Sequence, residues 1–376
     1  MNRGWLRRWS ALEDPGYPAG VALLSALLTF CFGVCAYLVI ENKMPSQGGF
    51  SIWQRWDAGW YIDVARHGYT GDPASERRYL ITFFPLYPFA VHLVSYIVKS
   101  IAGSALVVSN LACVGAFVYC YKLTRQEFDT RSARAAVFYF SVFPTAYFLH
   151  VGYSESLFLF LTMAAFYYAR RERWLLSSLF GMCATASRVS GIALLLPLAI
   201  EYMQQRRFRW VDMRRDALWL LLVPAGLAFY LWLNYYYFGD PLKFLEFQRN
   251  HWYRYLRSPA AAIKSNWLGL LGDKPIERVI QHGSGLAAFI IGTVITAIAP
   301  WRLRACYTTY LLINWVLIYC DSFTLSSPRY LLTDFPLFML MGRWHRPGLI
   351  RYAITMSSLL FYGLFTLQFV RGWWAH

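Results

Sequence analysis

The sequence predicts an all-α polytopic membrane protein, and three observations lead to this fold class. Of its 376 residues, 57% are hydrophobic, 19% are aromatic and only 15% are charged, whereas about a quarter of the residues in soluble domains are charged. Runs such as 21–40 and 217–238 approach the roughly 20 apolar residues that cross a bilayer. Lys and Arg gather in short loops between such runs. A soluble nucleic-acid-binding protein can share the net charge of +16 but not these runs, so we expect membrane lipid, and no nucleic acid, as a partner.

Twelve candidate membrane segments follow one another along the chain. They lie near residues 18–40, 84–102, 104–123, 135–151, 154–169, 174–187, 189–203, 217–238, 283–300, 305–323, 329–342 and 352–370. Several are too short to cross fully, which predicts a bundle of about 11 transmembrane or re-entrant helices. The first run is too long for the core of a cleavable signal, so we expect a retained anchor. No repeat or flexible linker divides the chain, and we interpret 1–376 as a single integral-membrane domain.

The distribution of basic residues orients the chain in the membrane. The positive-inside rule assigns loops rich in Lys and Arg to the cytoplasm. The basic positions are Arg3, Arg7 and Arg8; 122–134; Arg170, Arg171 and Arg173; 206–215; Arg302 and Arg304; and 343–351. This orientation conflicts with the number of segments unless 84–102 or 104–123 fails to cross fully, and the sequence leaves open which one.

Five stretches then face the non-cytoplasmic side. They are the loop at 41–83, the junction at 150–156, the region around Arg188, the stretch 326–329 and the longer segment 239–283. The last segment is rich in aromatic and basic residues, a mixture typical of a helix that lies in the headgroup region. We therefore expect the polar chemistry of this protein at its non-cytoplasmic face.

The stretch RWDAGWYIDVARHGY, residues 55–69, places a carboxylate among aromatic rings. The residues that share one side at helical spacing are Trp53, Asp57, Trp60 and Tyr61. An ordinary structural role for Asp57 is a helix cap or a partner for a buried arginine. A carboxylate among indole rings at a membrane surface is costly unless it is used, so we favour a functional role.

Two further motifs lie at predicted membrane junctions. The prolines of FFPLYPF, residues 83–89, suit the entry of a helix and carry little functional information. GYSESLF, residues 152–158, places Ser154 and Glu155 at an outer junction. Ser154 is equally suited to cap the following helix, with Glu155 favourable to its dipole.

Two arginines stand apart from the basic loops. Arg188 interrupts an apolar stretch in ATASRVSG, and Arg329 begins one in SSPRYL. An isolated arginine at membrane depth is a functional candidate, and its guanidinium suits bidentate binding of phosphate. The structural alternative is an ion pair with Asp57, Glu155 or Asp334, which would still place the arginine in a shared polar pocket.

Several common nucleotide-binding, metal-binding and catalytic motifs are absent from the sequence. It contains no GxxxxGK[ST], HExxH or GxSxG motif and no Asp-x-Asp pair, and its seven cysteines lie in or beside apolar segments without a CxxC pair. We therefore expect no metal site of the nucleotide-sugar-transferase type and no cofactor, and the sequence leaves open a requirement for a loosely held metal ion. One outward-facing acid with phosphate-suited arginines indicates a single displacement, in which a base deprotonates an acceptor hydroxyl while a phosphate leaves an activated carbon.

In this order, the motifs RWDAGWYIDVARHGY, FFPLYP, GYSESLF, SRVSG and SSPRYL resemble those of the PIG-V-like mannosyltransferases. The resemblance covers roughly residues 50–335. It implies a GT-C-type helical bundle whose first large external loop, 41–83, carries the catalytic acid and contains amphipathic helices. It also implies a polyprenyl-phosphate sugar, typically mannose, as the donor, and a glycolipid or glycan as the acceptor.

Carried onto this chain, the resemblance gives the candidate residues their roles. Asp57 becomes the general base for an inverting attack on the anomeric carbon, and Arg329 and Arg188 hold the lipid phosphate. The residues expected to line the sugar or acceptor pocket are Trp56, Trp60, Tyr61, Ser154, Glu155 and Tyr330.

Two other functions remain open at this point. One is a lipid or anion transporter, or a flippase, that uses the arginines as an anion pathway, although the sequence lacks the inverted repeats typical of transporters. The other is a GT-C enzyme that moves arabinose, glucose or aminoarabinose. We expect a bacterial plasma membrane rather than an endoplasmic reticulum membrane, with the active site on the non-cytoplasmic face.

Overall fold

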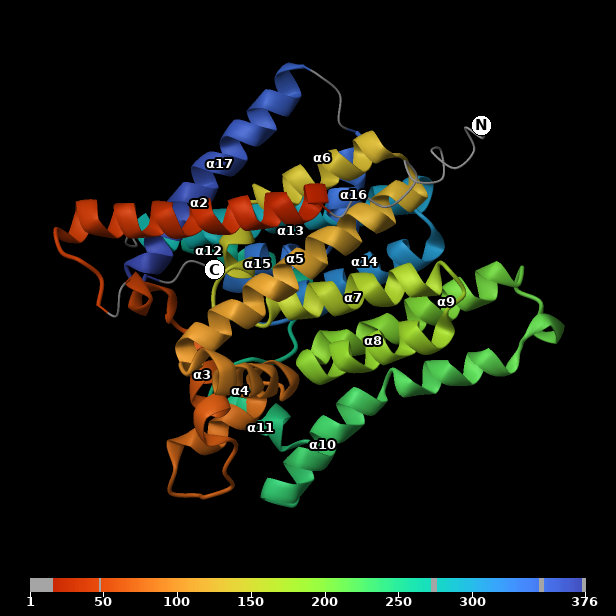
Figure 1. Ribbon diagram of the computed structural model, residues 1–376, viewed down its shortest axis with the longest axis horizontal. Helices are drawn as coiled ribbons and strands as arrows, with labels where there is room; N and C mark the ends of the chain where they lie inside the picture. Colours follow the sequence, from red (N-terminus) through yellow and green to blue (C-terminus); the bar gives the residue numbers. More distant parts are fainter. Residues whose placement is uncertain (1–15, 47–48, 272–275, 345–347, 374–376) are drawn as a thin grey trace, which may run out of the picture.

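The protein is a bundle of helices (Figure 1). The computed structural model describes residues 16–46, 49–271, 276–344 and 348–373. Among these residues the chain forms no strand, and one isolated antiparallel bridge joins Leu256 to Asp321. The all-α prediction is therefore confirmed. Arg3, Arg7 and Arg8 of the first basic cluster lie outside the described residues.

The helices vary widely in length. The α-helices are α2 (Gly16–Glu41), α3 (Asp57–His67), α4 (Leu86–Val98), α5 (Ile101–Glu127), α6 (Thr130–Ser141), α7 (Glu155–Ala169), α8 (Trp174–Ser187), α9 (Leu195–Gln205), α10 (Ala225–Phe238), α11 (Lys243–Asn250), α12 (Pro259–Leu271), α13 (Ile276–Arg302), α14 (Ala305–Tyr319), α15 (Ser327–Leu331), α16 (Pro336–Arg343) and α17 (Leu349–Val370). The 3-10 helices are η2 (Ser51–Trp53), η3 (Glu76–Thr82), η4 (Ala146–Leu149), η5 (Val189–Leu194), η6 (Trp210–Asp212), η7 (Arg215–Leu222) and η8 (Thr324–Ser326).

Fewer helices are long enough to cross a membrane than the sequence suggested. Among the described residues, five meet the length and hydropathy of a span, namely Gly16–Glu41, Ile101–Glu127, Arg215–Phe238, Arg278–Arg302 and Leu349–Val370. A sixth is possible if η3 and α4, which meet at 108°, form one broken span. The expected number of about 11 is thus not confirmed. Of the shorter apolar helices α7, α8 and α14, α7 packs inside the bundle, whereas α8 and α14 each keep one apolar side exposed.

The structure distinguishes the two segments between which the sequence could not choose. Helix α5 has 27 residues and meets the criteria for a span, whereas α4 has only 13. The backbone between them turns sharply, because Lys99 ends α4 at φ 58° and Ser100 begins α5 by accepting a hydrogen bond from the Gly103 amide at 3.2 Å. Such a left-handed residue followed by a serine cap ends one helix and starts another. The segment at 84–102 is therefore the shorter of the pair.

Helix α7 lies in the middle of the bundle, packed between α5 and α8 (Figure 1). Its sequence ESLFLFLTMAAFYYA is apolar on every side after Glu155, and a helix that is apolar all round is buried all round. Phe158, Met163 and Phe166 are fully buried. The charged residues are at its two ends: Glu155 at the start and Arg170 directly after the last residue. Each belongs to a separate cluster of ion pairs, and the two clusters fix the position of α7 along its axis.

These two clusters lie at opposite ends of the same helices. Glu155 begins α7 and Arg170 follows it, so roughly 22 Å of helix separates them at 1.5 Å per residue. Helix α8 runs back and is followed by Arg188. At the Glu155 end, α3, α4 and α11 gather, while α9 lies at the other end (Figure 1).

The close approach of α6 and α16 depends on a glycine and generates a stability prediction. A Cβ at Gly342 would lie 2.3 Å from the Ser132 carbonyl oxygen, and backbone atoms cannot move aside as a flexible side chain can. We expect Gly342→Ala to lower the free energy of unfolding by about 1–3 kcal/mol through overpacking. Thermal unfolding of the purified protein in detergent measures this loss.

The matched control is Gly20→Ala, since a Cβ at Gly20 meets no atom within 4 Å. This variant should unfold at or slightly above the wild-type temperature, because alanine favours a helix. Equal unfolding temperatures for the two variants would contradict the close contact between α6 and α16.

Candidate functional site

The four charged residues singled out in the sequence come together at the start of α7. Asp57 is the first residue of α3, Glu155 is the first residue of α7, Arg188 follows α8, and Arg329 lies in α15. Helix ends point their side chains toward a common region here, although Asp57 and Arg329 are 272 positions apart. The structure thus assembles one polar site from four separate elements.

One carboxylate oxygen of Glu155 contacts both arginines. Glu155 Oε1 lies 2.7 Å from Arg329 Nε and 2.7 Å from Arg188 Nη1. Glu155 is completely buried, and the Arg329 side chain is only 6% exposed. Two guanidinium groups repel each other unless an anion lies between them. The Glu155 carboxylate supplies this anion through ion pairs, although neither of its oxygens accepts a hydrogen bond of regular geometry from the described residues.

Asp57 completes the charge balance of the site. Arg329 Nη1 donates a hydrogen bond to Asp57 Oδ2 at 2.8 Å, so Arg329 bridges the two carboxylates. With Asp57, Glu155, Arg188 and Arg329 the positive and negative charges are equal in number. The Asp57 side chain is 21% exposed, more than the other carboxylate. Asp57 is therefore the acid of this group that an incoming molecule reaches first.

Tyr61 and Ser154 support Arg188 from the side of α3. Arg188 Nη1 donates to Ser154 Oγ at 3.3 Å, and Ser154 Oγ is 2.8 Å from the Tyr61 hydroxyl. Ser154 is completely buried. Burial raises the pKa of Tyr61 to about 12, so its hydroxyl stays protonated at neutral pH. Both residues here fix an arginine; their expected place in a sugar pocket stays a prediction.

The aromatic side chains around Asp57 divide into buried and exposed members. Trp56 and Trp60 are each 43% exposed, and Trp60 packs edge-on against Trp252. Trp56 has φ 53° and ψ −125°, a left-handed backbone that costs a bulky residue about 1–3 kcal/mol and occurs mainly where function requires it. The strained residue directly precedes Asp57 and turns the chain into α3.

The expected position of Trp53 on the same face as Asp57 was wrong. Trp53 belongs to η2 rather than to α3, and it is buried against Phe30 and Phe369. The helical spacing assumed in the sequence fails because the left-handed Trp56 separates the two helices. Trp53 is a core residue.

Tyr330 lies among three arginines, one of which was not singled out as a site residue. The guanidinium carbons of Arg188, Arg254 and Arg329 lie 5.6, 5.6 and 5.4 Å from the centre of its ring. Arg254 Nη1 also donates to the Tyr330 hydroxyl at 3.1 Å. Cations over an aromatic ring are attracted by its quadrupole. The signal for Arg254 in the sequence was the aromatic and basic composition of 239–283.

Arg254 is fixed by Asp321, which the sequence reading also missed. Its Nε donates to Asp321 Oδ2 at 3.0 Å. Burial alone would lower the pKa of Arg254, but the neighbouring Tyr330 and Asp321 raise it above its ordinary value. The bridge between Leu256 and Asp321 and the 2.7 Å hydrogen bond from the Arg257 amide to the Cys320 carbonyl hold this segment against the chain before α15.

Chemically, the arrangement offers a base and an anion site side by side. A guanidinium has five N–H donors, and the ion pairs use only some of those on Arg188 and Arg329. The remaining donors suit a phosphate. Within the described part of the chain, no group of three or more His, Cys, Asp or Glu side chains is arranged to hold a metal ion, and the expectation of no metal stays a prediction.

Comparisons with known proteins agree with the motifs. The model of a family described as Mannosyltransferase (PIG-V) matches residues 29–262. This range includes Asp57, Glu155, Arg188 and Arg254 but ends before Arg329, whereas the resemblance was expected to extend to about residue 335.

Curated relatives match a shorter stretch. GPI alpha-1,6-mannosyltransferase 2 of Cricetulus griseus is 31% identical over 156 residues, which are 39% of this chain and 30% of that protein. The Rattus norvegicus protein of the same name is 32% identical over the same shares. The match therefore spans less than a third of the length of these relatives.

Solved structures with a similar arrangement are larger proteins. The Archaeoglobus fulgidus oligosaccharyltransferase in the apo form gives a TM-score of 0.46 at 11% identity, covering 98% of this chain and 57% of that one. The archaeal oligosaccharyltransferase AglB from the same organism, in complex with an inhibitory peptide and a dolichol-phosphate, gives 0.45 at 12% identity, covering 96% and 56%.

The shared carboxylate of Glu155 generates a stability prediction. Glu155→Gln leaves two buried guanidinium groups without their common anion, and we expect the free energy of unfolding to fall by about 3–5 kcal/mol. Thermal unfolding in detergent, together with the yield of folded protein, measures the effect.

Asp63→Asn is the matched control, because Asp63 pairs with Arg77 at 3.0 Å on a partly exposed surface. Breaking such a pair costs about 0–1 kcal/mol. Similar losses in the two variants would show that Glu155 does not hold the arginines together.

Proposed function

This chain belongs to the PIG-V mannosyltransferase family, and from this premise we propose that it is a membrane glycosyltransferase that moves mannose from a polyprenyl-phosphate donor to a glycolipid or glycan acceptor. The observation that carries the proposal is the contact of Asp57 with Arg329 beside Arg188. It combines an accessible carboxylate with two cations suited to a phosphate.

In the proposed reaction, Asp57 acts as the general base. One of its carboxylate oxygens accepts the proton of the acceptor hydroxyl, whose oxygen forms a bond to the anomeric carbon of the sugar. The bond from that carbon to the phosphate oxygen breaks at the same time, and the electron pair leaves with the lipid phosphate. A single displacement of this kind inverts the anomeric centre.

Arg329 and Arg188 stabilise the negative charge that develops on the leaving phosphate. Donors that are already fixed in place cost no reorganisation during the reaction, and Glu155 holds both arginines in position. When a phosphate arrives, Arg329 shifts part of its hydrogen bonding from Asp57 to the ligand. That shift frees Asp57 Oδ2 for the proton, so donor binding and activation of the base are coupled.

In this proposal, the exposed aromatic residues contact the sugar. Trp56 and Trp60 flank Asp57 and are half exposed, and aromatic faces stack against sugar rings. Ser154 and Glu155 are completely buried, and in this proposal they position Arg188 and Arg329 at the border of the sugar pocket. Tyr330 places its ring beside the same arginines and borders the phosphate.

The membrane setting follows from the position of this site in the bundle. It lies at the end of α7 opposite the basic residues that follow that helix, and the positive-inside rule then directs it to the non-cytoplasmic face. We propose a bacterial plasma membrane rather than an endoplasmic reticulum membrane, and no resident metal or cofactor.

The assignment of Asp57 is tested by Asp57→Asn, which keeps the size of the side chain but accepts no proton. We expect transfer of labelled mannose from polyprenyl-phosphate mannose to a pool of lipid acceptors in proteoliposomes to fall by ~100-fold or more, since general-base catalysis contributes that much. Donor binding, measured separately, should persist. Asp63→Asn, on the same helix, should transfer normally.

Full activity of Asp57→Asn would remove Asp57 from the mechanism. If the wild type bound the donor and released it on the other side of the membrane without transfer, a flippase would replace the enzyme. Faster transfer from a donor that carries arabinose, glucose or aminoarabinose would instead replace mannose as the proposed donor sugar.

The phosphate site is tested by Arg188→Lys. Lysine keeps the charge opposite Glu155 but loses the planar fork that binds phosphate, so we expect the folded protein to persist while the Kd for the donor rises about tenfold. Equilibrium binding of polyprenyl-phosphate mannose in detergent measures this change. Arg77→Lys, in the surface pair with Asp63, is the control, and an unchanged Kd for Arg188→Lys would exclude Arg188 from the phosphate site.

A further inference from the structure

A cavity of about 430 Å³ opens at the end of the bundle opposite the candidate site. It lies where α5 and α13 end and α14 begins. The polar and aromatic residues of its wall are Glu127, Phe128, Gln204, Trp301, Arg302, Arg304 and Tyr307. None of them belongs to the proposed transfer reaction.

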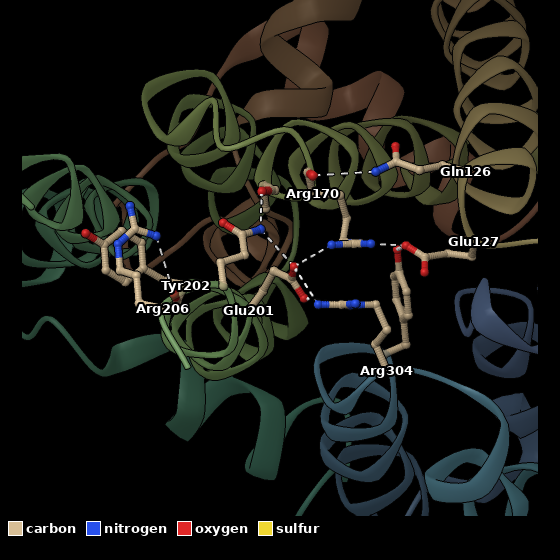
Figure 2. Close-up of polar contacts among 10 residues, drawn as sticks. Gln126, Glu127, Arg170, Glu201, Tyr202, Arg206 and Arg304 are labelled. Carbon is tan, nitrogen blue, oxygen red and sulfur yellow. Dashed lines mark hydrogen bonds and ion pairs between the residues drawn. The ribbon is translucent and has the colours of Figure 1, made fainter. Parts of the chain in front are cut away.

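A network of ion pairs lies beside this cavity (Figure 2) and shares Glu127 and Arg304 with its wall. Arg170 Nε lies 2.6 Å from Glu127 Oε1, and Arg170 Nη1 lies 2.8 Å from Glu201 Oε1. Arg304 Nε contacts Glu201 Oε2 at 3.3 Å. Glu201 is completely buried and lies between the two arginines. This network of two carboxylates and two guanidinium groups is electrically neutral.

Arg302 adds one uncompensated positive charge to the cavity. It is exposed and makes no ion pair with the described residues. Arg304 beside it is 31% exposed and keeps donors that its long contacts with Glu201 do not use. One singly charged phosphodiester would balance the site.

Glu127 does not exclude such an anion. Its side chain is 10% exposed, and its charge is neutralised by Arg170, while the Tyr307 hydroxyl donates to the same oxygen at 3.1 Å. Gln204 offers a hydrogen-bond acceptor beside the arginine donors. Its Oε1 is buried and accepts no hydrogen bond from the described residues. A buried carbonyl of this kind needs a donor. A hydroxyl on the headgroup would supply one.

The position of the cavity at the end of a candidate membrane span indicates a lipid as its ligand. Arg302 is the last residue of the candidate span Arg278–Arg302, so the cavity lies where lipid headgroups meet the protein. Trp301, directly before it, is 79% exposed, and tryptophan is enriched at this level of a membrane. Pro300 and Leu303 supply apolar wall beside it.

We propose that this cavity binds the phosphodiester of an anionic phospholipid whose headgroup carries a hydroxyl, such as phosphatidylglycerol. Arg302 and Arg304 bind the phosphate, the Gln204 carbonyl accepts the headgroup hydroxyl, and Trp301 lies against the glycerol and the upper acyl chain. The site is independent of the proposed transferase function and lies at the other end of the bundle.

The test compares three probes on the full-length protein in detergent micelles. Dioleoyl phosphatidylglycerol, dioleoyl phosphatidylcholine and sn-glycerol 3-phosphate are titrated, and bound molecules are counted by native mass spectrometry. We expect phosphatidylglycerol to bind at least about tenfold more tightly than phosphatidylcholine, as an unpaired arginine favours an anion. Tight binding of glycerol 3-phosphate alone would overturn the lipid as the ligand.

Arg302→Gln tests the site itself, and Arg215→Gln is its matched control. Both arginines are exposed and stand at the end of a candidate span, but only Arg302 lines the cavity. We expect Arg302→Gln to weaken phosphatidylglycerol binding about tenfold and Arg215→Gln to change it by less than about twofold. Equal effects of the two variants, or no selectivity for phosphatidylglycerol in the wild type, would overturn the proposal.

Discussion

The contact of one buried carboxylate with two arginines is the constraint on which the candidate site depends. Glu155 Oε1 touches Arg188 and Arg329 at 2.7 Å each, and without this anion two guanidinium groups could not share a buried space. Because Arg329 also contacts Asp57, the same carboxylate indirectly sets the position of the proposed base. The start of α7, the end of α8, the start of α3 and α15 are thereby fixed relative to one another.

In the centre of the bundle, charged residues lie at the ends of the helices, where they form ion pairs. Helix α7 is apolar throughout its length and carries Glu155 at one end and Arg170 just beyond the other. Charged groups inside a membrane protein are tolerated where they pair, and Glu201 pairs Arg170 with Arg304 as Glu155 pairs the arginines of the candidate site. A buried glutamate thus contacts two arginines at each end of α7. Glu155 does so beside the accessible Asp57, and Glu201 does so beside the cavity.

Much of this arrangement could be predicted from the sequence, and the failures have physical causes. Isolated charges in apolar stretches are visible in a sequence because their burial is costly, so Asp57, Glu155, Arg188 and Arg329 stood out. The expected number of about 11 transmembrane or re-entrant helices is not confirmed, because hydropathy does not distinguish a short helix buried in protein from one that crosses lipid. Trp53 was misplaced because one left-handed residue broke an apparently regular spacing. Arg254 reaches Tyr330 across 76 positions, a proximity that only folding creates.

The most direct test of the account is a cryo-electron microscopy structure of the full chain with a polyprenyl-phosphonate mannose, a donor analogue that cannot transfer its sugar. The account predicts that the phosphonate oxygens lie within hydrogen-bond distance of Arg329 and Arg188, with the anomeric carbon facing Asp57. It also predicts that Arg329 has moved away from Asp57 toward the ligand. A phosphonate bound elsewhere, for example against Arg302 and Arg304, or an Asp57 that remains paired with Arg329 and shielded from the sugar, would contradict it.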